Sequence, residues 1–168
     1  VGAVDLPGEI RNLVATEKIG GRTPSPFEGS VALVLKRLDL ALEDGDRIYA
    51  LVKGVGKASM GGIDDPAVSG EAVLMSLHRA FDDAAVDPKA VTILELQGNT
   101  LESASRGEKE SLDQFFSNRA SLQTASERPV TGSLSDLAGW AGSSHGLLSL
   151  VKSCLCLYQD NKSASLEN

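Results

Sequence analysis

The sequence predicts an α/β fold, with helices packed across a sheet. Short runs rich in Val, Ile and Leu alternate along the chain with longer segments whose apolar residues recur every three or four positions. Gly- and Ser-rich turns separate these segments. Of the 168 residues, 42% are apolar and 23% charged, which is typical of a globular domain and not of a disordered chain. This alternation of strands and helices is typical of α/β domains.

The chain begins with a loop-rich segment, residues 1–29, in which glycines and prolines cluster at 20–26. A β-compatible run follows at 31–36, and residues 37–42 predict one or two helical turns. We treat residues 1–29 as an entry segment that precedes the core.

The middle of the chain predicts a turn, a strand and a helix. Asp44-Gly45-Asp46 is a turn signal, and the apolar run at 48–55 predicts a strand that ends in glycines. After a loop at 57–68, Ser69 is placed to cap a helix over 70–86. That helix has an apolar face of Val73, Leu74, Leu77, Phe81 and Ala84.

The last part repeats the alternation. It predicts a strand at 91–96, a helix at about 104–118, a short strand at 129–133 and an apolar helix at about 143–158. Residues 30–158 therefore form the expected core. Residues 159–168 form a polar tail.

The charge excludes several classes of partner. The formal net charge of -7 argues against a protein that binds nucleic acid by neutralising phosphates or lies on an anionic membrane. No apolar run approaches the roughly 20 residues that a membrane span needs, and the first residues lack the positive charge of a signal peptide. We expect a cytoplasmic protein without nucleic-acid or membrane partners.

Cysteine and histidine are scarce, with two of each. Cys154 and Cys156 stand two apart in a helix-like run, where they cannot easily bridge; we expect small core thiols and no metal site, because a zinc site needs about four ligands. His78 falls on the polar side of a predicted helix and is expected at the surface.

Two sequence motifs fit known signatures only superficially. Residues 142–146 read G-S-S-H-G and fit the nucleophile elbow G-x-S-x-G, but no His follows Ser144 and the preceding strand ends near Ser133. Residues 54–58, G-V-G-K-A, lack the first glycine and the final Ser or Thr of a phosphate-binding loop. Neither motif predicts a site.

Four segments, taken together, resemble the β-ketoacyl synthases of fatty acid and polyketide assembly, members of the thiolase superfamily. They are P-F-E-G-S-V-A-L-V-L-K-R-L at 26–38, A-L-E-D-G-D-R-I-Y-A at 41–50, L-E-L-Q-G-N-T at 94–100 and G-S-L-S-D-L-A-G-W at 132–140. The resemblance extends through the helix that follows. Residues 2–6 resemble the strand that closes the first half of that fold. The likeness implies a partial thiolase-like fold with a mixed sheet, the C-terminal-half portion of a ketosynthase domain.

The resemblance implies that the catalytic positions are replaced. Members of this family use a nucleophilic Cys, two His residues that assist decarboxylation of a malonyl unit, and a nearby Lys. Here the two His positions hold Gln97 and Trp140, the Lys position holds Ser135, and the half that supplies the Cys is absent. His145 stands where the family usually has a small residue. We therefore assign no catalytic, cofactor or metal residue, and keep Ser144 and His145 as weak candidates.

The resemblance also implies a role and partners. We expect a non-condensing part of a fatty acid or polyketide synthase, similar to a chain-length factor, which shapes an acyl cavity beside an active ketosynthase. Its partners would be that ketosynthase, or the remainder of the same domain, and an acyl carrier protein, in a dimeric parent assembly. No cofactor would bind directly, because acyl chains arrive on the carrier's phosphopantetheine. An acyltransferase or decarboxylase activity that uses Gln97, Ser144 and His145 is the alternative, as is a free-standing binding module of inherited fold.

Overall fold

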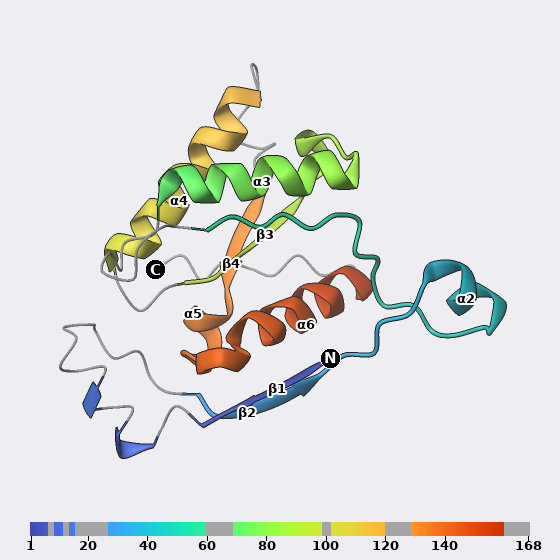
Figure 1. Ribbon diagram of the computed structural model, residues 1–168, viewed down its shortest axis with the longest axis horizontal. Coiled ribbons are helices and arrows are strands. Elements are labelled where there is room, and N and C mark those ends of the chain that lie inside the picture. The colour runs from blue at the N-terminus through green and yellow to red at the C-terminus, as the bar shows by residue number, and fades with distance from the viewer. Residues whose placement is uncertain are drawn as a thin grey trace. The chain divides into compact units, whose positions relative to one another are not determined.

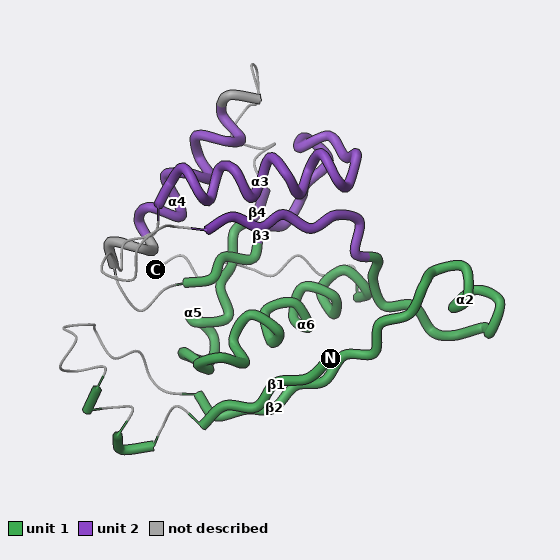
Figure 2. The backbone as a smooth tube through the Cα atoms, viewed as in Figure 1, with its two compact units in different colours: residues 1–51, 95–98, 131–168 green, residues 52–94, 99–130 purple. Residues whose placement is uncertain are grey.

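The computed structural model describes residues 1–6, 9–11, 14–15, 27–59, 69–98, 102–119 and 129–159. The loop predicted at 20–26, most of the loop at 57–68, Asn99-Thr100 and nearly all of the polar tail lie outside these residues. The chain divides into two compact units, coloured separately in Figure 2. The first comprises residues 1–51, 95–98 and 131–168, and the second comprises 52–94 and 99–130.

Two short strands open the first unit. β1 (Gly2–Asp5) pairs antiparallel with β2 (Gly29–Ala32), with Gly2 opposite Ala32. The strand inferred from the likeness of residues 2–6 is therefore present. The run predicted at 31–36 is a shorter strand that begins two residues earlier.

A short helix and a tight turn follow β2. α2 (Leu38–Glu43) agrees with the predicted helical turns, and the turn signal after it is confirmed by Gly45, whose φ of +68° favours glycine. The Lys36 ammonium ion-pairs with the Asp44 carboxylate and with Asp46, at 2.5 Å from the Asp46 oxygen. These contacts anchor the turn to the segment after β2.

The prediction of a strand over 48–55 is wrong, because these residues form no strand in the structure. The part within the second unit runs along α3 (Gly70–Ala84), in the direction opposite to the helix (Figure 1). The Val55 amide donates to the Asp83 carboxylate over 2.9 Å, and the Arg79 guanidinium donates to the Lys57 carbonyl over 2.6 Å. Side chains of α3 thus form hydrogen bonds to backbone groups of this segment, in place of the bonds that a neighbouring strand would form.

The second unit is built on α3 and α4 (Glu102–Arg119). The predicted cap is confirmed, since the Ser69 side chain accepts a hydrogen bond from the Ala72 amide. Phe115 is buried, and its ring centroid lies 5.2 Å from those of Phe81 and Phe116. Offset and edge-on ring pairs of this kind stabilise a core beyond the area they bury. The apolar face predicted for α3 therefore meets α4 at aromatic residues.

A second two-stranded sheet pairs β3 (Ile93–Leu96) with β4 (Val130–Ser133), visible side by side in Figure 1. The described strands therefore form two small sheets. A 3-10 helix, Pro88–Ala90, precedes β3. After β4 come α5 (Leu134–Ala138), which the sequence did not predict, a 3-10 turn at Gly142–Ser144, and α6 (His145–Tyr158). The α/β class is confirmed.

Within the described part of the chain, no helix combines the length and apolar character that crossing a bilayer would need.

Candidate active-site remnant

The loops that follow β3 and β4 meet in the first unit because two glycines permit it. Gly98 has a φ of +63°, and a Cβ there would overlap the Ser133 hydroxyl. Gly139 has φ +93° and ψ -166°, a region that is essentially restricted to glycine. These conformations bring the segment after β3 against the start of α5 and the turn before α6. The two loops carry the positions at which the resemblance places the catalytic residues.

The three replaced positions lie together, but their side chains do different things. Gln97 is exposed, whereas its backbone carbonyl faces inward and contacts His145. The Ser135 hydroxyl donates to the Gly98 carbonyl over 2.9 Å. The Trp140 ring stacks on the His145 ring, with centroids 4.4 Å apart and planes 28° apart. His145, five residues beyond Trp140, is thus the common neighbour of all three.

His145 is buried, with 1% of its surface exposed. Its Nδ1 accepts from the Ala141 amide over 3.4 Å, so the ring hydrogen resides on Nε2. Nε2 then donates to the Gln97 carbonyl over 2.9 Å, and the Ser135 oxygen lies 3.3 Å from it. Burial lowers the pKa of His145, and the Gln97 carbonyl and the Glu95 carboxylate oppose this shift only in part. The ring is therefore neutral at pH 7.

Ser144 lacks the geometry of a nucleophile. It lies in the 3-10 turn at Gly142–Ser144, and none of its surface is exposed. Its hydroxyl donates to the Ala141 carbonyl over 2.7 Å. Because that hydrogen bond points the proton at a backbone oxygen, His145 does not activate the hydroxyl. The rejection of a nucleophile elbow at 142–146 agrees with this geometry.

A nearly buried ion pair joins β3 to α6. The Lys152 ammonium lies 2.7 Å from Glu95 Oε2, and the two side chains are 14% and 11% exposed. The second carboxylate oxygen, Oε1, is buried and has no hydrogen-bond partner among the described residues. We did not predict this pair. Its signal in the sequence is a single charge within each of two otherwise apolar segments.

The turn before α6 is tied to the first strand. The Ser143 amide donates to the Asp5 carboxylate over 2.5 Å. Hydrogen bonds from the Ser143 side chain and backbone lower the pKa of Asp5. A Cβ at Gly142 would overlap that carboxylate, so the close approach requires glycine here. The position of His145 at the start of α6 thus depends partly on β1.

The remaining candidate residues stand apart from this cluster. Cys154 and Cys156 are free thiols. We expected both in the core, but the structure shows them only half-buried. His78 is exposed, as predicted, and its ring lies edge-on to Phe115 at 5.1 Å. Within the described ranges, no three His, Cys, Asp or Glu side chains are grouped so that they could hold a metal ion.

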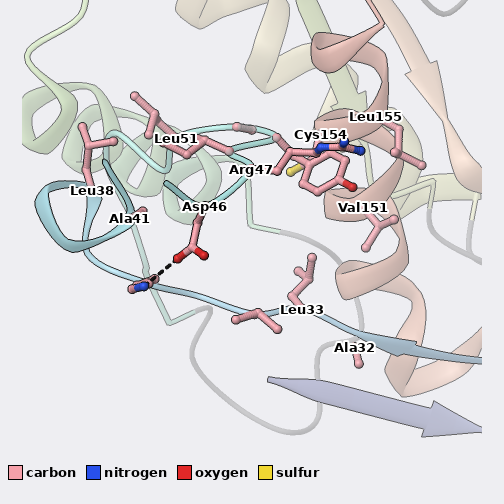
Figure 3. A pocket seen from close by; sticks show the side chains of 15 residues that line it. Ala32, Leu33, Leu38, Ala41, Asp46, Arg47, Leu51, Val151, Cys154 and Leu155 are labelled. Carbon is pink, nitrogen blue, oxygen red and sulfur yellow. Dashed lines mark hydrogen bonds and ion pairs between the residues drawn. The ribbon is translucent and has the colours of Figure 1, made fainter. Parts of the chain in front are cut away.

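An apolar pocket of about 520 Å³ lies elsewhere in the first unit (Figure 3). The segment after β2, α2, residues 46–51 and α6 form its walls, and Lys36 and Asp46 ion-pair at its edge. Its apolar lining and volume are typical of binding pockets. Leu33, Leu38, Leu51, Val151, Cys154 and Leu155 are among the lining residues. Its shape depends on residues 46–51, which belong to no strand.

Burial of His145 predicts that stability depends on pH. The folded pKa lies below the unfolded value near 6.5, so the unfolded chain binds the proton more readily. The contribution to stability is complete above about pH 6.5 and is lost as the pH falls toward the folded pKa. We expect His145→Gln to reduce the loss of unfolding free energy between pH 7 and pH 5, measured by urea denaturation. His78→Gln is the matched control, and an equal pH dependence in both variants would contradict this prediction.

Comparison with known proteins gives the family directly. Residues 49–167 match the family described as Beta-ketoacyl synthase, C-terminal domain. One chain of the polyunsaturated fatty acid synthase of Thraustochytrium sp. is 35% identical over 133 residues, covering 77% of this chain and 5% of the synthase chain. The 6-methylsalicylic acid synthase of Aspergillus niger is 29% identical over 159 residues, covering 93% of this chain and 8% of that protein. The chain thus spans a small fraction of these relatives.

Solved structures share the fold. The oxazolomycin ketosynthase domain OzmH KS7 of Streptomyces albus superposes with a TM-score of 0.80 and 24% identity, over 93% of this chain and 29% of that domain. The PfaC ketosynthase-chain length factor gives 0.81 and 23%, over 93% of this chain and 18% of that chain. A type II polyketide ketosynthase in complex with its acyl-carrier protein gives 0.77 and 18%, over 93% and 42%.

These structural likenesses establish the fold, and the family match covers well over half of the sequence. The chain has the partial, C-terminal-half ketosynthase fold that the four sequence segments implied. We conclude that the chain belongs to the β-ketoacyl synthase family and corresponds to its C-terminal domain.

Proposed function

We propose that this chain is a non-condensing, chain-length-factor-like part of a fatty acid or polyketide synthase. The observation that carries the proposal is the convergence of Gln97, Ser135 and Trp140 around a buried, neutral His145. These are the positions at which the resemblance places two His residues and a Lys.

The chemistry explains why the replacements matter. Decarboxylation of a malonyl thioester leaves negative charge on the thioester oxygen, and that charge needs aimed hydrogen-bond donors. Removing one such donor typically costs about 10²–10³ in rate. Here the Ser135 hydroxyl is directed at the Gly98 carbonyl, and the Trp140 ring stacks on His145. We infer that neither group stabilises that charge.

The comparisons support the partners that the proposal names. One structural neighbour is named as a ketosynthase with its chain length factor, and another as a ketosynthase in complex with an acyl-carrier protein. By analogy, an active ketosynthase and an acyl carrier protein are the proposed partners of this chain. The acyl groups would arrive on the carrier's phosphopantetheine, and this chain would help to shape the cavity that receives them.

The proposal predicts that the chain itself supports no condensation. In the assay, the full-length protein is given acyl- and malonyl-loaded carrier protein, and the condensation product on the carrier is measured by mass spectrometry. We expect Gln97→Ala and the wild type to form the same amount of this product. The conservative variant Gln97→Asn serves as the control. Turnover that depends on Gln97 would overturn the proposal.

The acyltransferase alternative makes a separate prediction. It requires a reactive Ser144, whereas the Ser144 hydroxyl is buried and donates to a backbone carbonyl. We expect no covalent labelling of Ser144 by a phosphonate or acyl probe. Labelling that disappears in Ser144→Ala would favour the alternative.

A further inference from the structure

A single side chain contacts all three of the replaced positions. The His145 ring bonds the backbone carbonyl of residue 97, lies 3.3 Å from the hydroxyl of Ser135 and stacks on the ring of Trp140. The resemblance gives position 145 a small residue, so the imidazole is additional volume at this point. It is also almost completely buried.

The contacts of His145 leave no nitrogen available for catalysis. Nδ1 accepts from the Ala141 amide, and the hydrogen on Nε2 is shared between the Gln97 carbonyl and the Ser135 oxygen. Because the Ser135 hydroxyl gives its own proton to the Gly98 carbonyl, its oxygen is free to accept. A general base needs an unshared nitrogen that faces the substrate. The ring instead joins backbone groups of two loops.

We propose that His145 is a plug that fills the space between the replaced catalytic positions and excludes a thioester from it. This inference rests on the proposed non-condensing function and adds the means by which the site is closed. Restoring the three family residues with Gln97→His, Ser135→Lys and Trp140→His is then insufficient, because the imidazole still occupies the site. His145→Ala is required as well.

The first test asks whether His145 fills a cavity shaped for its ring. In the full chain, His145→Gly should be destabilised, and added imidazole should raise its thermal midpoint by about 2–4 °C. Wild type and His78→Gly, in which an exposed histidine is lost, should show no such rise. A folded His145→Gly that imidazole does not stabilise would overturn the plug.

A second measurement does not depend on the variant being folded. In the wild-type chain, ¹⁵N spectra of the histidines should show one ring as the neutral Nε2–H form between pH 7 and pH 8, with a slowly exchanging hydrogen. The assignment is made by its loss in His145→Gln. A ring with its hydrogen on Nδ1, or one that exchanges as fast as His78, would overturn the proposal.

The third test separates the plug from the proposed function. A malonyl thioester that loses CO₂ and takes a proton from water becomes an acetyl thioester, which is measured on the carrier protein by mass spectrometry. We expect no product above the uncatalysed background from wild type or the triple variant. The variant that also carries His145→Ala should form acetyl thioester at least about 10²-fold faster than that background, the lower end of what a general acid–base group contributes. Activity in wild type would overturn the proposed function, whereas a quadruple variant no more active than the triple would overturn the plug.

Discussion

Replacing Lys152 with methionine is expected to lower the free energy of unfolding by about 3–5 kcal/mol. The substitution leaves the Glu95 carboxylate largely buried without its cation, and Oε1 has no hydrogen-bond partner among the described residues even in the wild type. An uncompensated charge in such surroundings costs much more than a lost surface contact. Equilibrium urea denaturation followed by circular dichroism measures the change.

Two comparisons show whether the buried charge is the cause. Glu95→Leu combined with Lys152→Met removes both charges, so its stability should lie much closer to that of the wild type than the single variant does. The exposed pair of Arg37 and Asp39, with side chains 77% and 61% exposed, is the matched control. Arg37→Met should leave stability almost unchanged. A double variant as unstable as Lys152→Met would contradict this explanation.

Gly56→Ala is expected to destabilise the second unit by about 1–3 kcal/mol. A Cβ at this position would overlap the Ser76 carbonyl oxygen and would lie 2.7 Å from the Ala80 amide nitrogen. Both are backbone atoms within α3, so they cannot move aside as a side chain can. The added methyl must therefore lift the segment from the helix and weaken the hydrogen bonds of Val55 and Lys57. Thermal unfolding measures the loss.

Gly146→Ala provides the matched control for that substitution. Gly146 lies in α6, and a Cβ there would meet no atom within 4 Å. Alanine is the better helix former by about 1 kcal/mol, so this variant should be as stable as the wild type or slightly more so. If the two substitutions changed stability equally, the packing of Gly56 on α3 would not be the reason that Gly56→Ala destabilises the protein.

The sequence predicted helices well where a periodic apolar face determines them. α3 and α4 carry such faces, and α3 begins at its predicted cap. The strand expected at 48–55 failed because β propensity becomes a strand only beside a partner. α5 was missed because five residues are too few to show a period, although Ser133 caps its first turn.

The candidate site was predictable in its positions but not in its contacts. The resemblance named Gln97, Ser135 and Trp140, whereas the role of His145 depends on a hydrogen bond to a residue 48 positions away. Local pattern carries no information about such a distance. The unusual feature in the sequence was a histidine where the resemblance places a small residue, and the contacts of His145 give that feature a physical meaning.

The bond between Asp5 and Ser143 spans 138 positions of the chain, and it constrains the order in which the protein folds. Contacts so distant in sequence slow folding, because a long loop must close before they form. During synthesis at about 5–20 residues per second, β1 waits on the order of 10 s before Ser143 exists. The residues of the second unit, 52–94 and 99–130, are all made within that interval. We therefore expect the second unit to fold before the Asp5 carboxylate can bind the Ser143 amide, even though β1 and β2 can already pair.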